Sequence, residues 1–421
     1  MVETTKPSSM EPMGGDSDLG SQRKNVWWLS LTSLFTDIQS EMIMPILPFF
    51  MREMLGASYT LIGFMEGLAD GVASVLKVIA GILSDRFGRR KPFVVVGYGL
   101  AWLAKVMYTW APTSRAVVGL RVVDRVGKGL RSSPRDALLA ASARRSERGR
   151  AFGLHRFMDT SGAFLGTLFT LILLRFAWTY QRIFLVAAIP GFVAFMIVIR
   201  RVHEVPVKRA SGASQIQKKV PFGAWLFIGT HGLFSLAYLN YALVLLLGTR
   251  LAHLQGWWGP VFYLWFNFVY ALSALGVGRL ADRFDDRAVL AFGYLMFVFL
   301  YGTAWLTHEG SIAVVVLLFG LYGIGVSAVE TIPRSYLGKI TPSHRRGTVM
   351  GWYHGFIGIM FFLGNTFAGW LWEHYRHSVM LKVLMVMSGV TLILFLIIMK
   401  FLPVPAGSPV TAPARGRMRN P

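Results

Sequence analysis

Twelve long apolar runs divide this chain and limit what it can fold into. Each covers roughly 19 to 26 residues, which lets an α-helix cross a hydrocarbon core of about 30 Å. Because 54% of the residues are hydrophobic and only 15% are charged, the sequence predicts an all-α membrane protein with twelve transmembrane helices. The predicted spans are 27–50, 60–82, 92–111, 116–139, 151–174, 181–200, 222–247, 258–279, 288–306, 311–333, 347–371 and 378–402.

The polar segments outside these spans divide the chain into five parts. Residues 1–25 are rich in Ser, Pro, Gly and acids and lack the apolar stretch of a signal peptide, so we expect a disordered cytoplasmic tail. Residues 403–421 form a second such tail. Between the tails we expect an N-terminal six-helix bundle at 26–200, a basic cytoplasmic linker at 201–221 and a C-terminal six-helix bundle at 222–402.

The 43 Lys and Arg residues fall unevenly on the two sides of this layout. The tails, the linker and the loops on their side hold most of them. By the positive-inside rule that side is cytoplasmic, which places both termini inside. The net charge of +22 is then a topology signal, and we expect no nucleic-acid partner because no soluble basic domain exists to bind one. The loops of the other side hold Arg52, Arg115, Arg175, Arg182, Arg250 and Arg376.

The two halves of the sequence repeat each other. The run GILSDRFGRR at 81–90 matches GRLADRFDDR at 278–287, each at the cytoplasmic end of a span. The run SERGRAFG at 146–153 matches HRRGTVMG at 344–351 with nearly the same spacing. A constant spacing between separate loops indicates two six-helix bundles in the same orientation.

With these motifs the chain resembles the major facilitator superfamily of secondary transporters over about 25–402. GILSDRFGRR is similar to the family's loop between helices 2 and 3, Arg125 and Gly129 fit its helix-4 motif, and the run GKGLRSSPRDA resembles a prokaryotic subgroup. The resemblance implies the family's fold and a latch that holds the two halves together in one state. The latch residues expected here are Gly81, Asp85, Arg86, Gly88, Arg89, Arg90, Asp136, Asp282 and Arg283.

The most highly charged stretch, RVVDRVGKGLRSSPRDALLA at 121–140, lies within a predicted span. On a helix its charged residues fall within an arc of roughly 140°. Each charge facing lipid would cost about 2.5–3.5 kcal/mol, so the stripe must face protein or water, and we predict that it lines an aqueous cavity. The predicted cavity residues are Glu66, Asp70, Arg121, Asp124, Lys128, Arg131, His231, Asn240, Glu330 and His354. The alternative for any one of them is a structural ion pair or a hydrogen-bonded core residue.

Two acids on the first span, Asp37 and Glu41, are the predicted proton carriers. They share one face of a helix at i and i+4. A carboxyl group in a cavity near Arg125 gains or loses a proton as its hydration changes, so we assign proton coupling to these three residues.

Several other chemistries have no support in the sequence. There is no cysteine, and Gly127-Lys128 lacks the spacing of a phosphate loop. No HExxH or GxSxG run occurs. We therefore expect no enzyme activity, no catalytic residues, no metal site and no cofactor.

The sequence thus predicts a proton-coupled secondary transporter, an antiporter that moves a small polar or charged solute by alternating access. We expect a multi-pass protein of the bacterial inner membrane, monomeric, whose partners are its substrate, protons and the lipid bilayer. Export is favoured by the resemblance, with a drug, a siderophore or an organic anion as the solute. The alternatives are an uptake permease of the same fold and a non-transporting assembly factor or sensor.

Overall fold

The computed structural model describes residues 16–144, 147–205, 220–307, 311–342 and 345–403, and these are helical almost throughout. The first half contributes α1 (Asp16–Ile43), α3 (Tyr59–Phe87), α4 (Lys91–Met107), α5 (Ser114–Ala141), α6 (Arg148–Arg175) and α7 (Tyr180–Arg201). The second half contributes α8 (Phe222–Ala237), α9 (Tyr241–Leu251), α10 (Gly259–Arg283), α11 (Asp286–Leu306), α12 (Ile312–Ile340), α13 (Arg346–Tyr375) and α14 (His377–Ile398). Residues 1–15 and 404–421 of the predicted tails and most of the predicted linker lie outside the described residues.

Ten helical segments in the described ranges are long and apolar enough to cross a membrane, with α8 and α9 counted as one. The two long helices that do not meet this criterion are α1 and α5, which carry the predicted charged residues. With them the fold has the twelve crossings that the sequence predicts. α1 begins at Asp16, within the predicted tail 1–25, because a helix satisfies its own backbone hydrogen bonds and can extend beyond the membrane.

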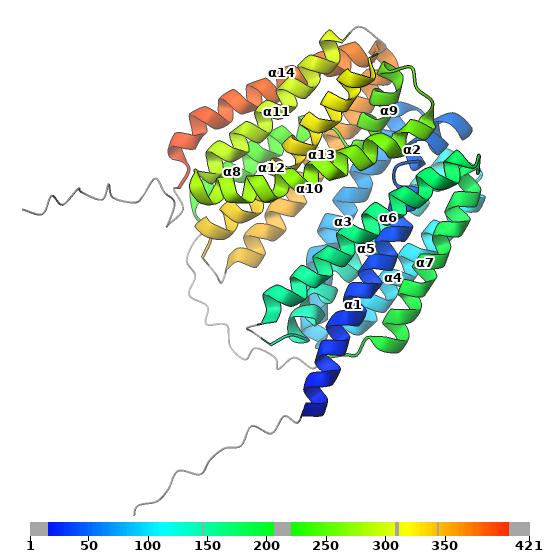
Figure 1. Ribbon diagram of the computed structural model, residues 1–421. Helices are drawn as coiled ribbons and strands as arrows, with labels where there is room; N and C mark the ends of the chain where they lie inside the picture. The colour runs from blue at the N-terminus through cyan, green and yellow to red at the C-terminus, as the bar shows by residue number, and fades with distance from the viewer. Residues whose placement is uncertain (1–15, 145–146, 206–219, 308–310, 343–344, 404–421) are drawn as a thin grey trace, which may run out of the picture.

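The helices form two groups that follow the sequence halves (Figure 1). In the first half α1 packs on α6 and α7, and α5 packs between α3 and α4; in the second half α12 packs on α10 and α11. The longest contact between the halves joins α3 to α13. It is close because glycines line it: a Cβ atom at Gly67 would lie 2.7 Å from Phe362 Cα, and one at Gly358 would lie 3.2 Å from Gly71 Cα.

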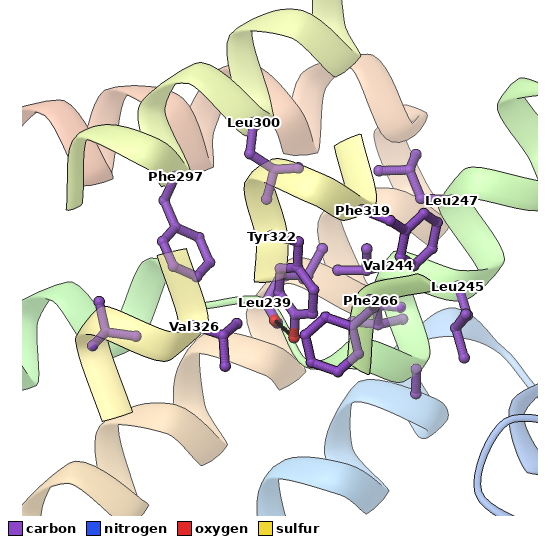
Figure 2. Packing of buried hydrophobic residues seen from close by; sticks show 14 of the residues in the cluster. Leu239, Val244, Leu245, Leu247, Phe266, Phe297, Leu300, Phe319, Tyr322 and Val326 are labelled. Atoms are coloured by element: carbon purple, nitrogen blue, oxygen red, sulfur yellow. Dashed lines mark hydrogen bonds between the residues drawn. The ribbon is translucent and has the colours of Figure 1, made fainter. Parts of the chain in front are cut away.

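The predicted span 222–247 is broken at Tyr238, Leu239 and Asn240, which separate α8 from α9. Side chains from other helices satisfy the freed backbone groups, as a break at membrane depth requires. Tyr322 Oη donates to Leu239 O at 3.0 Å, and Tyr301 Oη accepts from Leu239 N at 3.2 Å. Figure 2 shows the Tyr322 bond within the apolar core of the second half.

Asn365 on α13 holds the same break from the other side. Its Nδ2 donates to Tyr238 O at 3.1 Å and its Oδ1 accepts from Asn240 N at 2.7 Å. The side chain of Asn240 then caps α9 by accepting from Ala242 N at 2.8 Å. The break is therefore a specified feature of the second half.

Candidate substrate cavity and ionic network

A cavity of about 580 Å³ lies between the two halves, a volume typical of sites for small molecules. We call the end of the bundle at which α1 begins and α14 finishes the terminal end. The cavity wall extends from Glu41 and Asn240, near the middle of the bundle, to Lys77 and Arg334, nearer the terminal end. Both halves supply ionisable side chains to it. These are Glu41, Asp70, Lys77, Lys128, Arg156, His231, Glu330, Arg334 and His354.

The opposite end of the bundle is closed by contacts between the halves. The ring of Tyr59 stacks on Trp372 with centroids 4.0 Å apart, and the guanidinium of Arg52 lies 4.2 Å from the Tyr59 ring centroid. Tyr59 N also donates to Glu373 Oε2 at 2.7 Å, and Arg250 Nη1 donates to Tyr59 Oη at 3.2 Å. The cavity therefore faces the terminal end.

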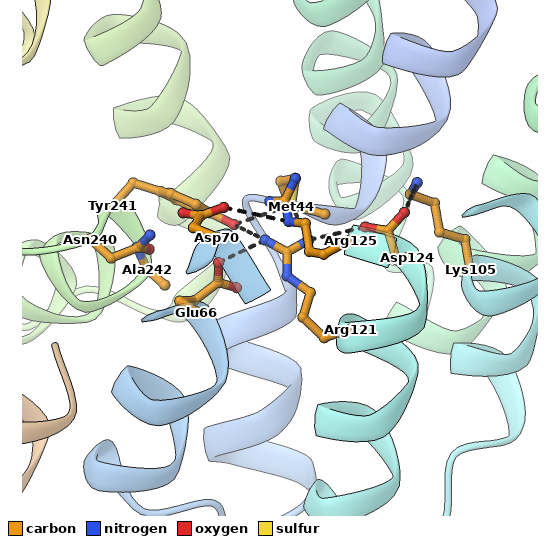
Figure 3. A network of polar contacts seen from close by, with 10 residues as sticks. All are labelled: Met44, Glu66, Asp70, Lys105, Arg121, Asp124, Arg125, Asn240, Tyr241 and Ala242. Carbon is orange, nitrogen blue, oxygen red and sulfur yellow. Dashed lines mark hydrogen bonds and ion pairs between the residues drawn. The ribbon is translucent and has the colours of Figure 1, made fainter. Parts of the chain in front are cut away.

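Three residues of the charged stripe of α5, Arg121, Asp124 and Arg125, are buried in an ionic network (Figure 3). Arg121 is fully buried, and its Nη2 donates to Glu66 Oε2 at 2.7 Å. Asp124 accepts from Lys105 Nζ at 2.5 Å and lies 3.5 Å from Arg121 Nη1. These two acids and two bases from α3, α4 and α5 balance one another, so the apolar bundle contains them without a net charge.

This placement differs from the predicted lining. Glu66, Arg121, Asp124 and Arg131 do not line the cavity. Arg131 is 6% exposed and lies 4.5 Å from the ring centroid of Tyr98 on α4. The reason is that neighbouring helices supply counter-charges and an aromatic face, so these groups gain their partners from protein and not from water.

The other predicted cavity residues line it. Asp70 and Lys128 do so from the first half, and His231, Asn240, Glu330 and His354 from the second. His231 Nδ1 is 2.7 Å from Tyr294 Oη, and Glu330 Oε1 accepts from Tyr238 Oη at 3.1 Å.

The predicted coupling residues lie at the edge of the cavity and behind it. Arg125 Nε is 3.6 Å from Asp70 Oδ1, and the carboxyl of Glu41, in the wall, lies beside the Tyr263 hydroxyl of α10. The carboxyl of Asp37 lies beside that of Asp159 on α6. Asp159 in turn accepts from Ser33 Oγ at 2.9 Å and from Arg156 Nη1 at 3.1 Å.

The predicted latch residues lie at the terminal end. Gly88 ends α3 in the left-handed region with φ 66°, and Gly81 approaches α5 so closely that a Cβ atom would lie 2.7 Å from Ser133 Oγ. Arg90 Nη2 donates to Asp85 Oδ1 at 3.0 Å. Within the described residues, no hydrogen bond or ion pair joins Asp85, Arg86, Arg89, Arg90 or Asp136 to the second half.

The matching loop of the second half differs from the first. Asp285 stands where the first loop has Gly88, and it caps α11 by accepting from Arg287 N at 2.9 Å. Burial raises the pKa of the Asp285 carboxyl, but hydrogen bonds from the Arg287 side chain and backbone outweigh this and hold that pKa below its usual range. Arg283 is exposed at the end of α10, and the side chain of Asp282 lies outside the described part.

Sequence reasoning did not single out Lys105, Asp159, Tyr241 or Arg334. Lys105 is the one lysine in an otherwise apolar run, 92–111, and such a lysine signals a buried acidic partner. Tyr241 on α9 accepts from Arg121 Nη2 at 3.2 Å and so connects the ionic network to the second half. No pattern in the sequence indicates that bond, since it depends on how the halves pack.

Two repeated bundles with a cavity between them, open at one end, define a polytopic membrane transporter. The sequence profile of the Major Facilitator Superfamily matches residues 29–257 and 233–420. The chain therefore belongs to this superfamily, and it is a multi-pass secondary transporter of small molecules and not an enzyme.

Relatives and solved structures agree with this assignment. An uncharacterised MFS-type transporter of Methanocaldococcus jannaschii is 30% identical over 384 residues, which cover 88% of this chain and 94% of that protein. The multidrug resistance protein MdtH of Yersinia enterocolitica is 26% identical over 365 residues, which cover 82% of this chain and 86% of that protein.

Among solved structures, a bacterial homologue of the human lysosomal transporter Spinster, inward-facing and occupied, has a TM-score of 0.71 at 14% identity. The match covers 90% of this chain and 96% of that one. The nucleoside transporter NupG has a TM-score of 0.72 at 14% identity, covering 89% of this chain and 99% of that one. At these identities the likeness shows the fold alone.

Proposed function

We propose that this protein is a proton-coupled antiporter that exports a small polar or charged solute from the cytoplasm across the bacterial inner membrane. The observation that carries the proposal is the cavity between the halves, charged on both sides, closed at one end and facing the other. With both termini in the cytoplasm, as the loop charges predict, the cavity faces the cytoplasm and takes its solute from there.

Proton coupling is assigned to Asp37, Glu41 and Arg125. The proximity of Asp37 and Asp159 supports the assignment, because two neighbouring carboxylates repel each other and a proton bound between them relieves the repulsion. Glu41 lies in the cavity wall, where opening and closing changes its hydration. The similarity to a multidrug resistance protein supports export over uptake.

Transport by purified protein in proteoliposomes tests the proposal. The panel contains an organic anion, a siderophore and a cationic drug, each measured with and without a pH gradient. We expect gradient-driven movement of at least one solute, and we expect Asp37→Asn to reduce it to background because the amide cannot exchange a proton. Asp18→Asn, on α1 but outside the predicted spans, is the control and leaves movement unchanged.

Two outcomes would contradict proton coupling. One is gradient-driven movement that persists in both Asp37→Asn and Arg125→Ala. The other is movement that responds to a Na⁺ gradient and not to pH. Movement of no solute in the panel under any gradient would contradict export of these three solute classes.

A further inference from the structure

The charges in the cavity wall are not equally engaged. The wall contains three carboxylates, Glu41, Asp70 and Glu330, of which only Asp70 is paired with a base among the described residues. Asp70 is 3.6 Å from Arg125, Glu330 accepts from Tyr238, and Glu41 lies beside the Tyr263 hydroxyl. In the described part of the chain, Glu41 and Glu330 therefore have no counter-charge of their own, since a tyrosine hydroxyl donates a hydrogen bond but does not cancel a charge.

Most of the basic side chains of the wall have no acidic partner among the residues that the structure describes. Lys77, Lys128, Arg156 and Arg334 are all exposed to the cavity. Arg156 is paired with Asp159. Within the described residues, Lys77, Lys128 and Arg334 form no ion pair and no hydrogen bond through their charged groups. These three cations outnumber the two acids that lack a counter-charge there, Glu41 and Glu330, so the described wall carries an excess of positive charge.

Two of these cations come from different halves and lie near each other. Lys77 is on α3 and Arg334 is on α12, and their charges are close enough to repel. His354 on α13 is a neighbour of both and offers a ring nitrogen. Asp136, the acid nearest to Lys77, is paired with Arg135 at 2.9 Å. Such a convergence of donors from both halves suits a carboxylate, sulfonate or phosphate group.

The rest of the wall is largely aromatic. Rings with a hydroxyl or an apolar face suit the body of an organic molecule better than a hydrated inorganic ion. They come from both the broken helix and the helices packed on it. The rings are Tyr238, Tyr241, Phe266, Tyr270, Tyr322, Tyr353 and Phe361.

We propose that the solute is an organic anion whose negative group binds between Lys77, Arg334 and His354 and whose body lies on the tyrosine and phenylalanine rings. This inference rests on the proposed transport function and names the class of its substrate. An anion there also removes the repulsion between Lys77 and Arg334 across the two halves. Binding of the anion therefore favours approach of the halves at the terminal end, which a cationic solute would oppose.

Two dyes with the same xanthene skeleton and opposite charge provide the test. Fluorescein is anionic and rhodamine 123 is cationic, and binding of each to the purified full chain in detergent is followed by fluorescence anisotropy without any gradient. We expect fluorescein to bind more tightly than rhodamine 123. We expect Lys77→Gln with Arg334→Gln to weaken fluorescein binding by about tenfold or more, since each removes a charge-assisted hydrogen bond.

Two further variants keep the result interpretable. Lys77→Arg with Arg334→Lys retains both charges and keeps most of the affinity, which excludes a folding defect. Lys77→Glu with Arg334→Glu reverses the preference toward rhodamine 123. Lys382→Gln is the control, because that lysine lies on α14 against Trp305, outside the cavity wall, and its removal leaves both affinities unchanged.

The inference is overturned if the unmodified protein prefers rhodamine 123, binds no fluorescein, or binds fluorescein equally well without Lys77 and Arg334 charges. Because no gradient is applied, these results do not depend on proton coupling. Gradient-driven export of a cationic drug would support the proposed function and contradict the anion site. Fluorescein binding with no gradient-driven transport would support the anion site and contradict the proposed function.

Discussion

Lys105 lies inside an apolar helix with 1% of its surface exposed, and its ammonium group bonds to Asp124. Taking such a pair out of water is costly, and removing Lys105 leaves Asp124 buried with only Arg121, which is 3.5 Å away and already bonded to Glu66. The pair is on α4 and α5, away from the cavity wall. Its effect on folding can therefore be measured separately from substrate binding.

We predict that Lys105→Met destabilises the protein by about 3 kcal/mol. The double variant Lys105→Met with Asp124→Leu should recover most of this loss, because it removes both charges. Thermal unfolding in detergent measures both, with Lys382→Met as the control for losing an exposed lysine. A single variant as stable as the unmodified protein, or a double variant less stable than the single one, would show that the pair is not coupled as described.

At the residue scale the sequence predicted charged residues on long helices but not which of them line the cavity. Asp70, Lys128 and Glu330 line the cavity, whereas Arg121 and Arg131 do not. Helical periodicity places a side chain on a face of its helix, but its surroundings depend on the neighbouring helices. Lys105, which bonds to Asp124, and Tyr98, which packs against Arg131, both lie on α4.

At the scale of single elements, the break between α8 and α9 differs most from the sequence prediction of one continuous span. Hydropathy does not detect it, because Tyr238, Leu239 and Asn240 are not helix breakers and the run stays apolar. The groups that hold it open, Asn365 and Tyr322, are far away in sequence. The other helices are predictable from apolar length, except α1 and α5, whose charges lower their mean hydropathy.

We predict that Asn365→Leu lowers stability by about 2 kcal/mol or more, because Asn240 N and Tyr238 O would each lose a partner at membrane depth. Thr366→Val is the matched control: its hydroxyl bonds only within α13, to Phe362 O, so we expect a smaller effect. Thermal unfolding of the two variants side by side gives the comparison. Equal stability of both would mean that Asn365 does not hold the break.

At the scale of the whole molecule, the repeat and the loop charges predicted two like bundles, and the family assignment agrees with that fold. Which end of the cavity is closed could not be predicted from the sequence. The stacked Tyr59 and Trp372 close one end, while the latch residues Asp85 and Asp136 bond only within their own half among the described residues. The same sequence motifs are present whichever end of the cavity is open, so the packing of the helices is needed to tell which end is closed.

The central claim is that the cavity between the halves opens to one side at a time. The chain has no cysteine, so spin labels can be placed without removing any. One pair, Phe87→Cys and Phe284→Cys, spans the terminal end; another, Met54→Cys and Trp257→Cys, spans the opposite end. All four positions are exposed.

Double electron–electron resonance on both pairs, recorded in lipid across a range of pH, is the most direct measurement. We predict that as protonation shifts the population, the distance across one end shortens while the distance across the other lengthens. Distances that stay fixed at every pH, or that shorten and lengthen together at both ends, would contradict alternating access through this cavity.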